Sequence, residues 1–167
     1  MRQVKVRPAT EADHAAIRVL GARLTEGAAS WRPAEGFASA ATGWVDSALS
    51  DQDDDHPVWV AEVDGVVVGA AAASVQRHFS GQSDCYLGEL VVDAAVEGRG
   101  IGRALMQRVE HWGRTRGAAT ITLDTGAANQ RARAFYAALG YLEEQVQLTK
   151  PIGPTTSPPP PSPPAGS

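Results

Sequence analysis

The pattern of apolar and polar positions changes its period several times along the chain and predicts a succession of strands and helices. Residues 4–7 alternate as a short strand. Apolar residues then recur at helical spacing as far as Leu24, and Thr10 with Asp13 forms a variant of the capping box at the start of that helix. A second helix is predicted over residues 38–49. The first part of the chain therefore indicates one strand followed by two helices.

The middle of the chain has the alternation and the turn residues of paired strands. Residues 58–63 and 66–76 flank an Asp-Gly pair at 64–65, which is typical of a two-residue hairpin turn. Gly69 interrupts the second strand and indicates a bulge or the close approach of another segment. Residues 85–92 form the next predicted strand. These segments predict a meander of neighbouring strands.

Strands and helices alternate in the last part of the chain. Residues 120–125 and 141–148 are predicted strands, and residues 130–139 are a predicted helix. A further helix over residues 100–116 has one apolar face, formed by Ile101, Leu105, Val109 and Trp112. The whole pattern predicts the α/β (α+β) class, with a mixed sheet flanked by helices.

Between the strand at 85–92 and the helix at 100–116 lies a turn with three alternating glycines, Gly98, Gly100 and Gly102. Glycines allow a ligand to approach the backbone closely, and the first N–H groups of a helix favour an anion. This arrangement predicts a phosphate site, the alternative being a glycine-rich turn without a ligand. The spacing of the glycines matches neither the dinucleotide-binding fingerprint nor the Walker loop.

Composition restricts the chemistry further. The formal net charge is −4 and the pI is near 5.5, which argues against a nucleic-acid partner. Cys85 is the one cysteine, so an internal disulfide and a cysteine metal cluster are excluded, and its use as a nucleophile is not favoured. The four histidines are scattered without ligand spacing, so no metal is expected.

The length of 167 residues predicts a single folded domain. We expect that domain to cover residues 1–150, because residues 151–167 are rich in proline and serine and are expected to be a disordered tail. The start of the chain lacks a secretory signal, and the longest apolar stretch, residues 66–73, is shorter than the ~20 residues of a membrane helix. No membrane partner and a cytoplasmic location are therefore expected.

The glycine turn resembles the acetyl-CoA motif of the GNAT superfamily of N-acetyltransferases, Arg/Gln-x-x-Gly-x-Gly/Ala, which falls here on residues 97–102. Glu97 stands where the family has Arg or Gln, and a carboxylate there is expected to repel a phosphate if it points inward, whereas binding by the backbone amides does not depend on this side chain. Residues 129–141 are similar to the downstream family motif Asn-x-x-Ala-x-x-x-Tyr followed by Leu-Gly-Tyr. The resemblance implies a GNAT-like, mostly antiparallel sheet of six to seven strands flanked by about four helices.

The resemblance further implies acetyl-CoA as co-substrate. The residues that it assigns to cofactor binding are Val91, Val92, Gly98, Arg99, Gly100, Ile101, Gly102, Arg103, Asn129 and Tyr136. Of these, Val91 or Val92 would give a backbone N–H to the thioester oxygen, and Arg99 and Arg103 would supply positive charge. Asn129 has an alternative interpretation as a helix N-cap.

For catalysis, the resemblance gives Tyr136 the role of the acid that protonates the departing thiolate. A tyrosine at helical spacing is also typical of a core residue, so both interpretations are kept. Glu89 lies in an otherwise apolar strand, where burial favours a general base. An exposed structural position, a base acting through water, and His78 as base are the alternatives.

These features predict direct transfer of an acetyl group to a primary amine, with a small-molecule amine favoured over a peptide or protein amine. The acceptor pocket is expected to involve Trp31, Phe37, Trp44, His78 and Phe79. Together with the acidic loop at 51–55 and the net negative charge, these residues favour a cationic amine, the alternative being core packing for the aromatic residues and a solvated loop. The alternative is an acyl-CoA-sensing module with the same fold and little or no turnover. A homodimer is compatible with the sequence.

Overall fold

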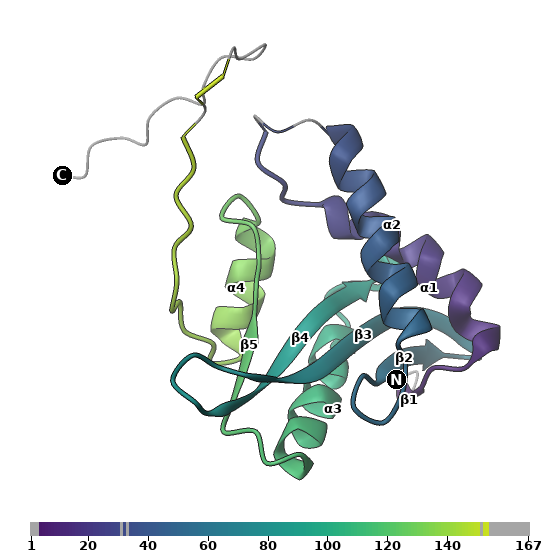
Figure 1. Ribbon diagram of the computed structural model, residues 1–167. Helices are drawn as coiled ribbons and strands as arrows, with labels where there is room; N and C mark the ends of the chain where they lie inside the picture. Colours follow the sequence, from purple (N-terminus) through teal and green to yellow (C-terminus); the bar gives the residue numbers. More distant parts are fainter. Residues whose placement is uncertain (1–3, 31, 33, 151, 154–167) are drawn as a thin grey trace.

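A five-stranded sheet is the centre of the fold in the computed structural model, which describes residues 4–30, 32, 34–150 and 152–153 (Figure 1). The strands follow one another across the sheet in chain order. The first four pair antiparallel, whereas the last two pair parallel. The strands are β1 (Lys5–Pro8), β2 (Val58–Val63), β3 (Val66–Arg77), β4 (Ser83–Val92) and β5 (Thr120–Leu123).

Four α-helices and three short 3₁₀ turns connect the strands within the described residues. The α-helices are α1 (His14–Gly21), α2 (Ala34–Ser50), α3 (Ile101–Thr115) and α4 (Gln130–Ala138). The 3₁₀ turns are η1 (Glu11–Asp13), η2 (Ala22–Thr25) and η3 (Ala94–Val96). The predicted fold class and the expected four helices are confirmed.

The sheet is buried on both faces because successive side chains of its central strands point to opposite sides. Trp59 and Ala61 of β2 pack with the apolar face of α3, whereas Val58 and Val60 pack with α1 and α2. Gly21 of α1 packs directly on α2, because a Cβ on Gly21 would lie 2.5 Å from Val45 Cγ2. The helices α1 and α2 thus cover one face, and α3 covers the other (Figure 1).

Two β-bulges interrupt the sheet. Val68 is the additional residue where β3 faces β2, and Gly88 is the additional residue where β4 faces β3. The predicted close approach at Gly69 is confirmed, because a Cβ there would lie 3.0 Å from the Val91 carbonyl oxygen. The bulge at Gly88 lies beside the place where β4 and β5 separate. Their parallel pairing ends at Leu87 and Leu123, after which β4 continues to Val92 paired with β3 only.

The prediction of six to seven strands was wrong, because the sheet of the described residues has five. Residues 141–148 were the predicted sixth strand, and they are extended but belong to no ladder. Alternation of side chains predicts an extended segment, whereas a strand also needs a neighbour to which its backbone can pair. The first predicted helix is also divided, since η1, α1 and η2 together replace a continuous helix from Thr10 to Leu24.

Candidate active site

The glycine turn joins the end of β4 to the start of α3. Asp93 begins the turn by accepting a hydrogen bond from the Ala95 N–H at 2.9 Å. Gly98 and Gly100 have φ values of +72° and +81°, a conformation that favours glycine. A Cβ on either residue would meet no atom within 4 Å, so the backbone of both residues is open to a ligand.

Gly102 has a different function in the structure from Gly98 and Gly100. A Cβ on Gly102 would lie 3.1 Å from Phe135 Cζ, so this glycine allows α3 and α4 to approach closely. The first backbone hydrogen bond of α3 runs from the Ala104 N–H to the Gly100 carbonyl at 3.0 Å. The N–H groups of the preceding turn have no partner inside the helix and lie at the positive end of its dipole.

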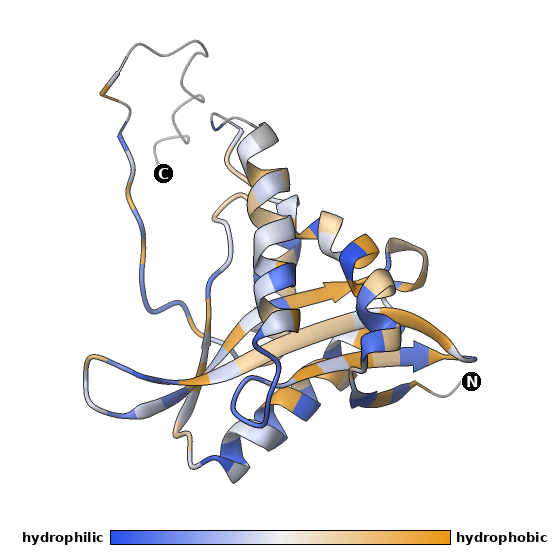
Figure 2. Ribbon diagram, turned by 45° about the vertical axis from the view of Figure 1, so that its right-hand side comes forward, coloured by the Kyte–Doolittle hydropathy of each residue, from blue (hydrophilic) through white to orange (hydrophobic). Residues whose placement is uncertain are grey.

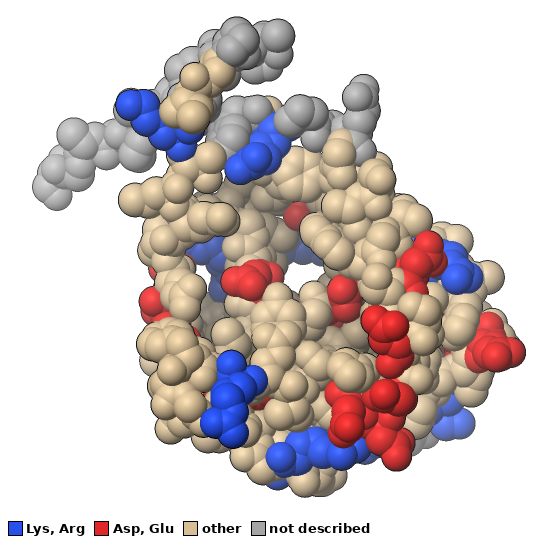
Figure 3. Space-filling view, in the orientation of Figure 1, with Lys and Arg blue, Asp and Glu red and all other residues tan. Residues whose placement is uncertain are grey.

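A cleft of about 1230 Å³ opens beside this turn, where β4 and β5 diverge. It is hollowed into the middle of the face shown in Figure 3. Residues of η2, α2, β4, the glycine turn, the end of β5 and α4 line it. The volume exceeds that of a typical small-ligand pocket, at roughly 300–1,000 Å³, and is large enough for an extended cofactor and an acceptor.

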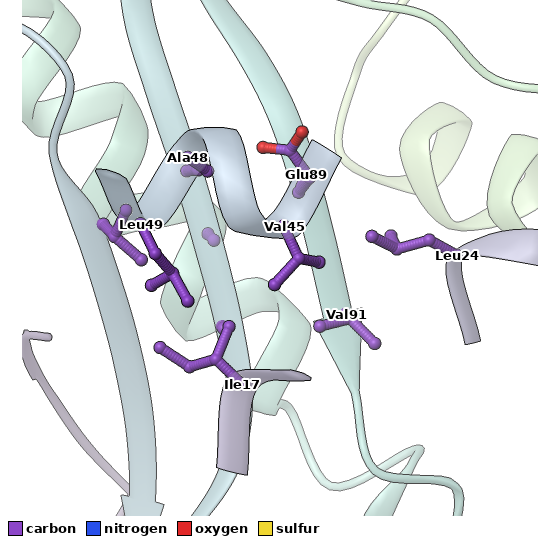
Figure 4. Close-up of a pocket in the computed structure, with 11 residues that line it drawn as sticks. Ile17, Leu24, Val45, Ala48, Leu49, Glu89 and Val91 are labelled. Atoms are coloured by element: carbon purple, nitrogen blue, oxygen red, sulfur yellow. The ribbon is translucent and has the colours of Figure 1, made fainter. Parts of the chain in front are cut away.

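Glu89 lies in β4 directly after the bulge and lines the cleft. Its side chain is half-buried, and it also borders a small cavity of about 20 Å³ between the sheet and α1 and α2. Figure 4 shows its carboxylate above the apolar side chains of that cavity, among them Ile17, Val45 and Val91. Burial raises the pKa of Glu89 to about 7. The carboxyl group can therefore exchange a proton near neutral pH.

Tyr136 lines the same cleft from the second half of α4. Its ring makes edge contacts with Phe135 and Tyr141, at centroid distances of 5.2 Å and 5.5 Å, and packs against the core below α3. Burial raises the pKa of Tyr136 to about 12, so the phenol keeps its proton at neutral pH. The side chain thus has both a packing contact and a surface in the cleft.

Asn129 is the N-cap of α4, as one of the two interpretations predicted. Its Oδ1 accepts from the Ala132 N–H at 3.0 Å, and its Nδ2 donates to the Glu26 carbonyl at 3.2 Å. A Cβ on Gly27 would lie 2.3 Å from Asn129 Cβ, and one on Gly126 would lie 2.5 Å from the Gly27 carbonyl oxygen. Two loops distant in sequence therefore meet beside the cleft at two glycines. A cofactor contact of Asn129 remains a prediction.

Glu97 is held by arginines on both sides. Arg23 Nη1 lies 2.8 Å from Glu97 Oε1, and Arg131 Nη2 forms a second ion pair with Glu97 Oε2. Arg23 also donates to the Val92 carbonyl and pairs with Glu26 at 2.7 Å. These contacts join η2, the glycine turn and the start of α4. The carboxylate that sequence analysis expected to repel a phosphate is thus neutralised by two residues that sequence analysis did not identify.

The other predicted cofactor residues have different positions. Arg103 is exposed and lines the cleft, whereas Arg99 is exposed but does not line the described cleft. The side chain of Ile101 is in the core, so this residue faces the cleft through its backbone. Val91 and Val92 both line the cleft, and the Val92 carbonyl faces outward to Arg23.

The residues predicted for an acceptor pocket are not all brought together. Phe37 and Trp44 of α2 line the cleft. His78 and Phe79 lie in the β3–β4 turn with their rings 4.0 Å apart, and neither lines the cleft of the described residues. Trp31 lies outside the described residues.

The acidic loop at 51–55 is also away from the cleft, because Asp55 pairs with Arg116 at the end of α3. The acidic groups that do line the cleft include Glu89 and Asp124, and Asp124 accepts from the Tyr86 hydroxyl at 3.1 Å. Sequence analysis did not identify Asp124, because this residue is distant from Glu89 in the chain and only folding brings both to the cleft.

Among the described residues, no three potential metal ligands lie together, and no helix has the length and hydropathy of a membrane span.

A comparison with family models decides the identification. The model of the acetyltransferase (GNAT) family matches residues 25–141, which include η2, the cleft strands, the glycine turn and α4. The chain belongs to the acetyltransferase (GNAT) family.

Individual GNAT relatives are more distant. Glucosamine 6-phosphate N-acetyltransferase 1 of Oryza sativa subsp. japonica is 33% identical over 98 residues, covering 56% of this chain and 58% of that protein. An uncharacterized N-acetyltransferase of Methanocaldococcus jannaschii is 31% identical over 105 residues, covering 62% of this chain and 46% of that protein. The chain thus spans about half the length of the curated relatives it matches.

Solved structures confirm the GNAT fold. The aminoglycoside N-acetyltransferase AAC(6')-Iy in complex with CoA superposes with a TM-score of 0.67 at 22% identity. The match covers 92% of this chain and 97% of that one. At this identity the likeness shows the fold alone.

The glycine turn fits the pyrophosphate of acetyl-CoA, the acetyl donor of the GNAT family. The open backbone at Gly98 and Gly100 allows close approach, and the start of α3 offers N–H groups to an anion. Arg103 adds positive charge at the cleft, and Arg23 and Arg131 offset the negative charge of Glu97 that would oppose binding.

Proposed function

We propose that this protein transfers the acetyl group of acetyl-CoA directly to the primary amine of a small cationic molecule. One observation carries the proposal: Glu89, with a pKa near 7, and Tyr136, a protonated phenol, line the same cleft as the glycine turn. A group able to accept a proton and a group able to give one therefore border the space that fits the cofactor.

Bound acetyl-CoA supplies an activated acetyl group as a thioester. The amine reacts in its unprotonated form, and Glu89, directly or through a water molecule, takes the proton that the nitrogen loses as the new amide bond forms. A β4 backbone N–H, from Val91 or Val92, donates to the thioester oxygen as it gains charge. Tyr136 gives its proton to the sulfur when the carbon–sulfur bond breaks, and the products are the amide and the CoA thiol.

The lining of the acceptor side supports a cationic amine. Glu89 and Asp124 contribute carboxyl groups, while Phe37 and Trp44 contribute aromatic rings. Carboxylates and aromatic faces both attract ammonium groups. The names of two similar proteins specify small amines, glucosamine 6-phosphate and aminoglycosides. These observations favour a small amine over a protein amine.

The test has a binding step and a turnover step. Acetyl-CoA is added while thermal unfolding is followed, and thiol release is then measured with amino sugars, aminoglycosides, polyamines and a lysine peptide. We expect acetyl-CoA to raise the melting temperature and at least one small cationic amine to release thiol. Stabilisation without thiol release from any amine would instead support an acyl-CoA-sensing module, and no stabilisation at millimolar acetyl-CoA would contradict the cofactor assignment.

Two aromatic variants locate the acceptor. Trp44→Ala removes an aromatic ring from the cleft, whereas Phe79→Ala removes one that is 86% exposed on the β3–β4 turn. We expect Trp44→Ala to raise the KM for the amine and Phe79→Ala to leave it unchanged. The reverse result would move the acceptor pocket to the β3–β4 turn.

A further inference from the structure

The small cavity between the sheet and helices α1 and α2 adjoins the cleft. Leu24, Glu89 and Val91 line both spaces, so the cavity and the cleft share a wall. Glu89 and Val91 are alternate residues of β4, and both side chains are therefore on the sheet face that α1 and α2 cover. Among the described residues that line the cavity, every one except Glu89 is apolar. An apolar space thus lies next to the carboxyl group that we assign as the base.

The cavity results from the small side chains of β3. Residues 70–73 are four successive alanines, and Ala70 and Ala72 face α1 and α2. Figure 2 shows this run as a pale stretch of the sheet next to α2. A larger apolar side chain at either position would occupy the space that alanine leaves. Protein interiors contain few spaces as large as a water molecule, so this one needs an explanation.

The cavity suits a hydrocarbon group better than water. A buried water molecule needs a cavity of roughly 10–15 Å³ or more and two to four polar partners. The cavity has about 20 Å³, but Figure 4 shows the carboxylate oxygens of Glu89 pointing away from Ile17, Val45 and Val91. Apolar cavities of this kind stay dry and accept apolar ligands. The volume is sufficient for about one or two carbon atoms of a chain.

The proposed chemistry leaves this side of the cleft to the acyl chain. The thioester carbon has three substituents, of which the oxygen is assigned to a β4 N–H and the sulfur to Tyr136 of α4. The acyl chain is the third. On the face covered by α1 and α2, the cleft is lined by η2 and α2, and Leu24 of η2 is the residue that also borders the cavity. A chain longer than acetyl therefore has an apolar space beside it.

We propose that this cavity is a subsite for the acyl chain, so that the protein binds propionyl-CoA more tightly than acetyl-CoA and transfers the propionyl group to its amine. The inference rests on the proposed function, since it requires the thioester to lie in the cleft. The bond changes are those of acetyl transfer. The carbon–nitrogen bond forms, the carbon–sulfur bond breaks, the nitrogen loses one proton and the sulfur gains one.

A series of acyl-CoA compounds measures the length of the subsite. Titration calorimetry without an amine gives the Kd of CoA and of its acetyl, propionyl, butyryl and hexanoyl thioesters. One additional buried CH₂ group should make the Kd of propionyl-CoA about fourfold lower than that of acetyl-CoA. Hexanoyl-CoA should bind more weakly than propionyl-CoA, because its chain is longer than a cavity of about 20 Å³ can hold. Thiol release with an accepted amine then tests transfer of the propionyl group.

Two matched variants of α2 locate the subsite. Ala48 lines the cavity, whereas Ala38 is exposed and lines neither the cavity nor the cleft of the described residues. Ala48→Val adds two methyl groups toward the cavity and should abolish the fourfold preference for propionyl-CoA. Ala38→Val makes the same substitution in the same helix and should keep it.

Ile17→Val changes the cavity in the opposite direction. It removes one carbon from the lining, so the ratio of butyryl-CoA affinity to propionyl-CoA affinity should rise above that of the wild type. This variant also tests the proposal if Ala48→Val does not fold, and thermal unfolding shows which variants are folded.

The outcomes separate this inference from the proposed function. A protein that binds acetyl-CoA and releases its thiol, but binds propionyl-CoA no more tightly, would overturn the acyl subsite alone. A preference for propionyl-CoA that persists in a folded Ala48→Val variant would overturn its position in this cavity. If CoA and all four thioesters fail to bind, the cofactor assignment is contradicted and the acyl subsite with it.

Discussion

The two sides of strand β4 differ in how completely the sheet is covered. Toward β3 and β2, residues 58–61 and 70–73 are exposed by at most 9% because helices pack on both faces. Toward β5, pairing lasts for four residue pairs and then stops, and α4 has no buried residue. The first region, which we call the closed side, has the burial that stabilises a fold. The second region, which we call the open side, leaves a cleft where polar groups meet a ligand.

One strand belongs to both regions, and its bulge separates them. Before Gly88, β4 pairs with β3 and β5 together, and after it β4 pairs with β3 alone while its other edge borders the cleft. Glu89 lies directly after this change, with apolar packing on one side and the cleft on the other. Strand β4 therefore forms part of the buried sheet and also carries Glu89, whose pKa is raised, at the edge of the cleft.

The largest effect is expected on the open side. Tyr136→Phe removes the hydroxyl that we assign as acid and keeps the ring that packs against Phe135 and Tyr141. The turnover number should fall by about 10²- to 10⁴-fold, the range of general acid catalysis, while acetyl-CoA affinity and melting temperature change little. Steady-state thiol release and thermal unfolding give these quantities. Unchanged turnover would leave Tyr136 as a packing residue.

A stability effect is expected on the closed side. Arg7 donates two hydrogen bonds to Asp13, at 2.7 Å and 2.9 Å, and these hold the pKa of this buried carboxyl well below its usual range. Asp13→Asn should lower the free energy of unfolding at pH 7 by about 2 kcal/mol. A lowered folded-state pKa stabilises the protein above the unfolded pKa of about 4, so the difference should shrink as the pH falls below that value.

Urea unfolding at pH 7 and at pH 3 measures that difference. Asp46→Asn is the matched control, because the Arg18–Asp46 pair is about half exposed at both side chains and should contribute less than about 1 kcal/mol. Equal losses in both variants would show that the Arg7–Asp13 contact does not support the closed side.

The smallest effect is expected from alanine at Gly100 and at Gly117, which lie at the two ends of α3. Comparing the two variants separates the cost of backbone strain from the loss of ligand binding. Gly100 and Gly117 have φ values of +81° and +76°, and a Cβ on either would meet no atom within 4 Å. An alanine should cost about 1 kcal/mol of stability at each position. Gly100→Ala should in addition weaken acetyl-CoA binding, because Gly100 lines the cleft and Gly117 does not. Titration calorimetry with acetyl-CoA distinguishes the two variants, and equal affinities would place the phosphate away from the turn.

Sequence alone predicted the elements whose signal is local. The apolar stripe of α3, the Asp-Gly turn between β2 and β3, and the glycine turn depend on residues close in the chain. The strand at 141–148 was predicted by the same kind of signal, but pairing depends on a neighbour that a local pattern does not specify. The pattern thus described the conformation of that segment and not its partner.

The sequence predicted which residues belong to the site better than it predicted the contacts between them. Glu89, Tyr136 and the glycines lie around one cleft, as their motifs indicated. The ion pairs of Glu97 with Arg23 and Arg131 join three elements that only folding brings together, so spacing along the chain gave no sign of them. His78 and Phe79 were placed near the pocket by their order in the chain, whereas the β3–β4 turn carries them away from the cleft.

The pH dependence of kcat/KM in the wild type and in Glu89→Gln tests the proposed chemistry most directly. Protonation of the acceptor amine affects both proteins alike, so the ratio of the wild-type kcat/KM to that of Glu89→Gln isolates the contribution of Glu89. This ratio should be large at pH 7 and above and should fall about tenfold per pH unit below pH 7 as Glu89 takes up a proton. Burial disfavours the ionised carboxylate, so Glu89→Gln should unfold at no lower temperature than the wild type above pH 7. A variant that keeps the wild-type rate and the same fall below pH 7 would contradict the role of Glu89.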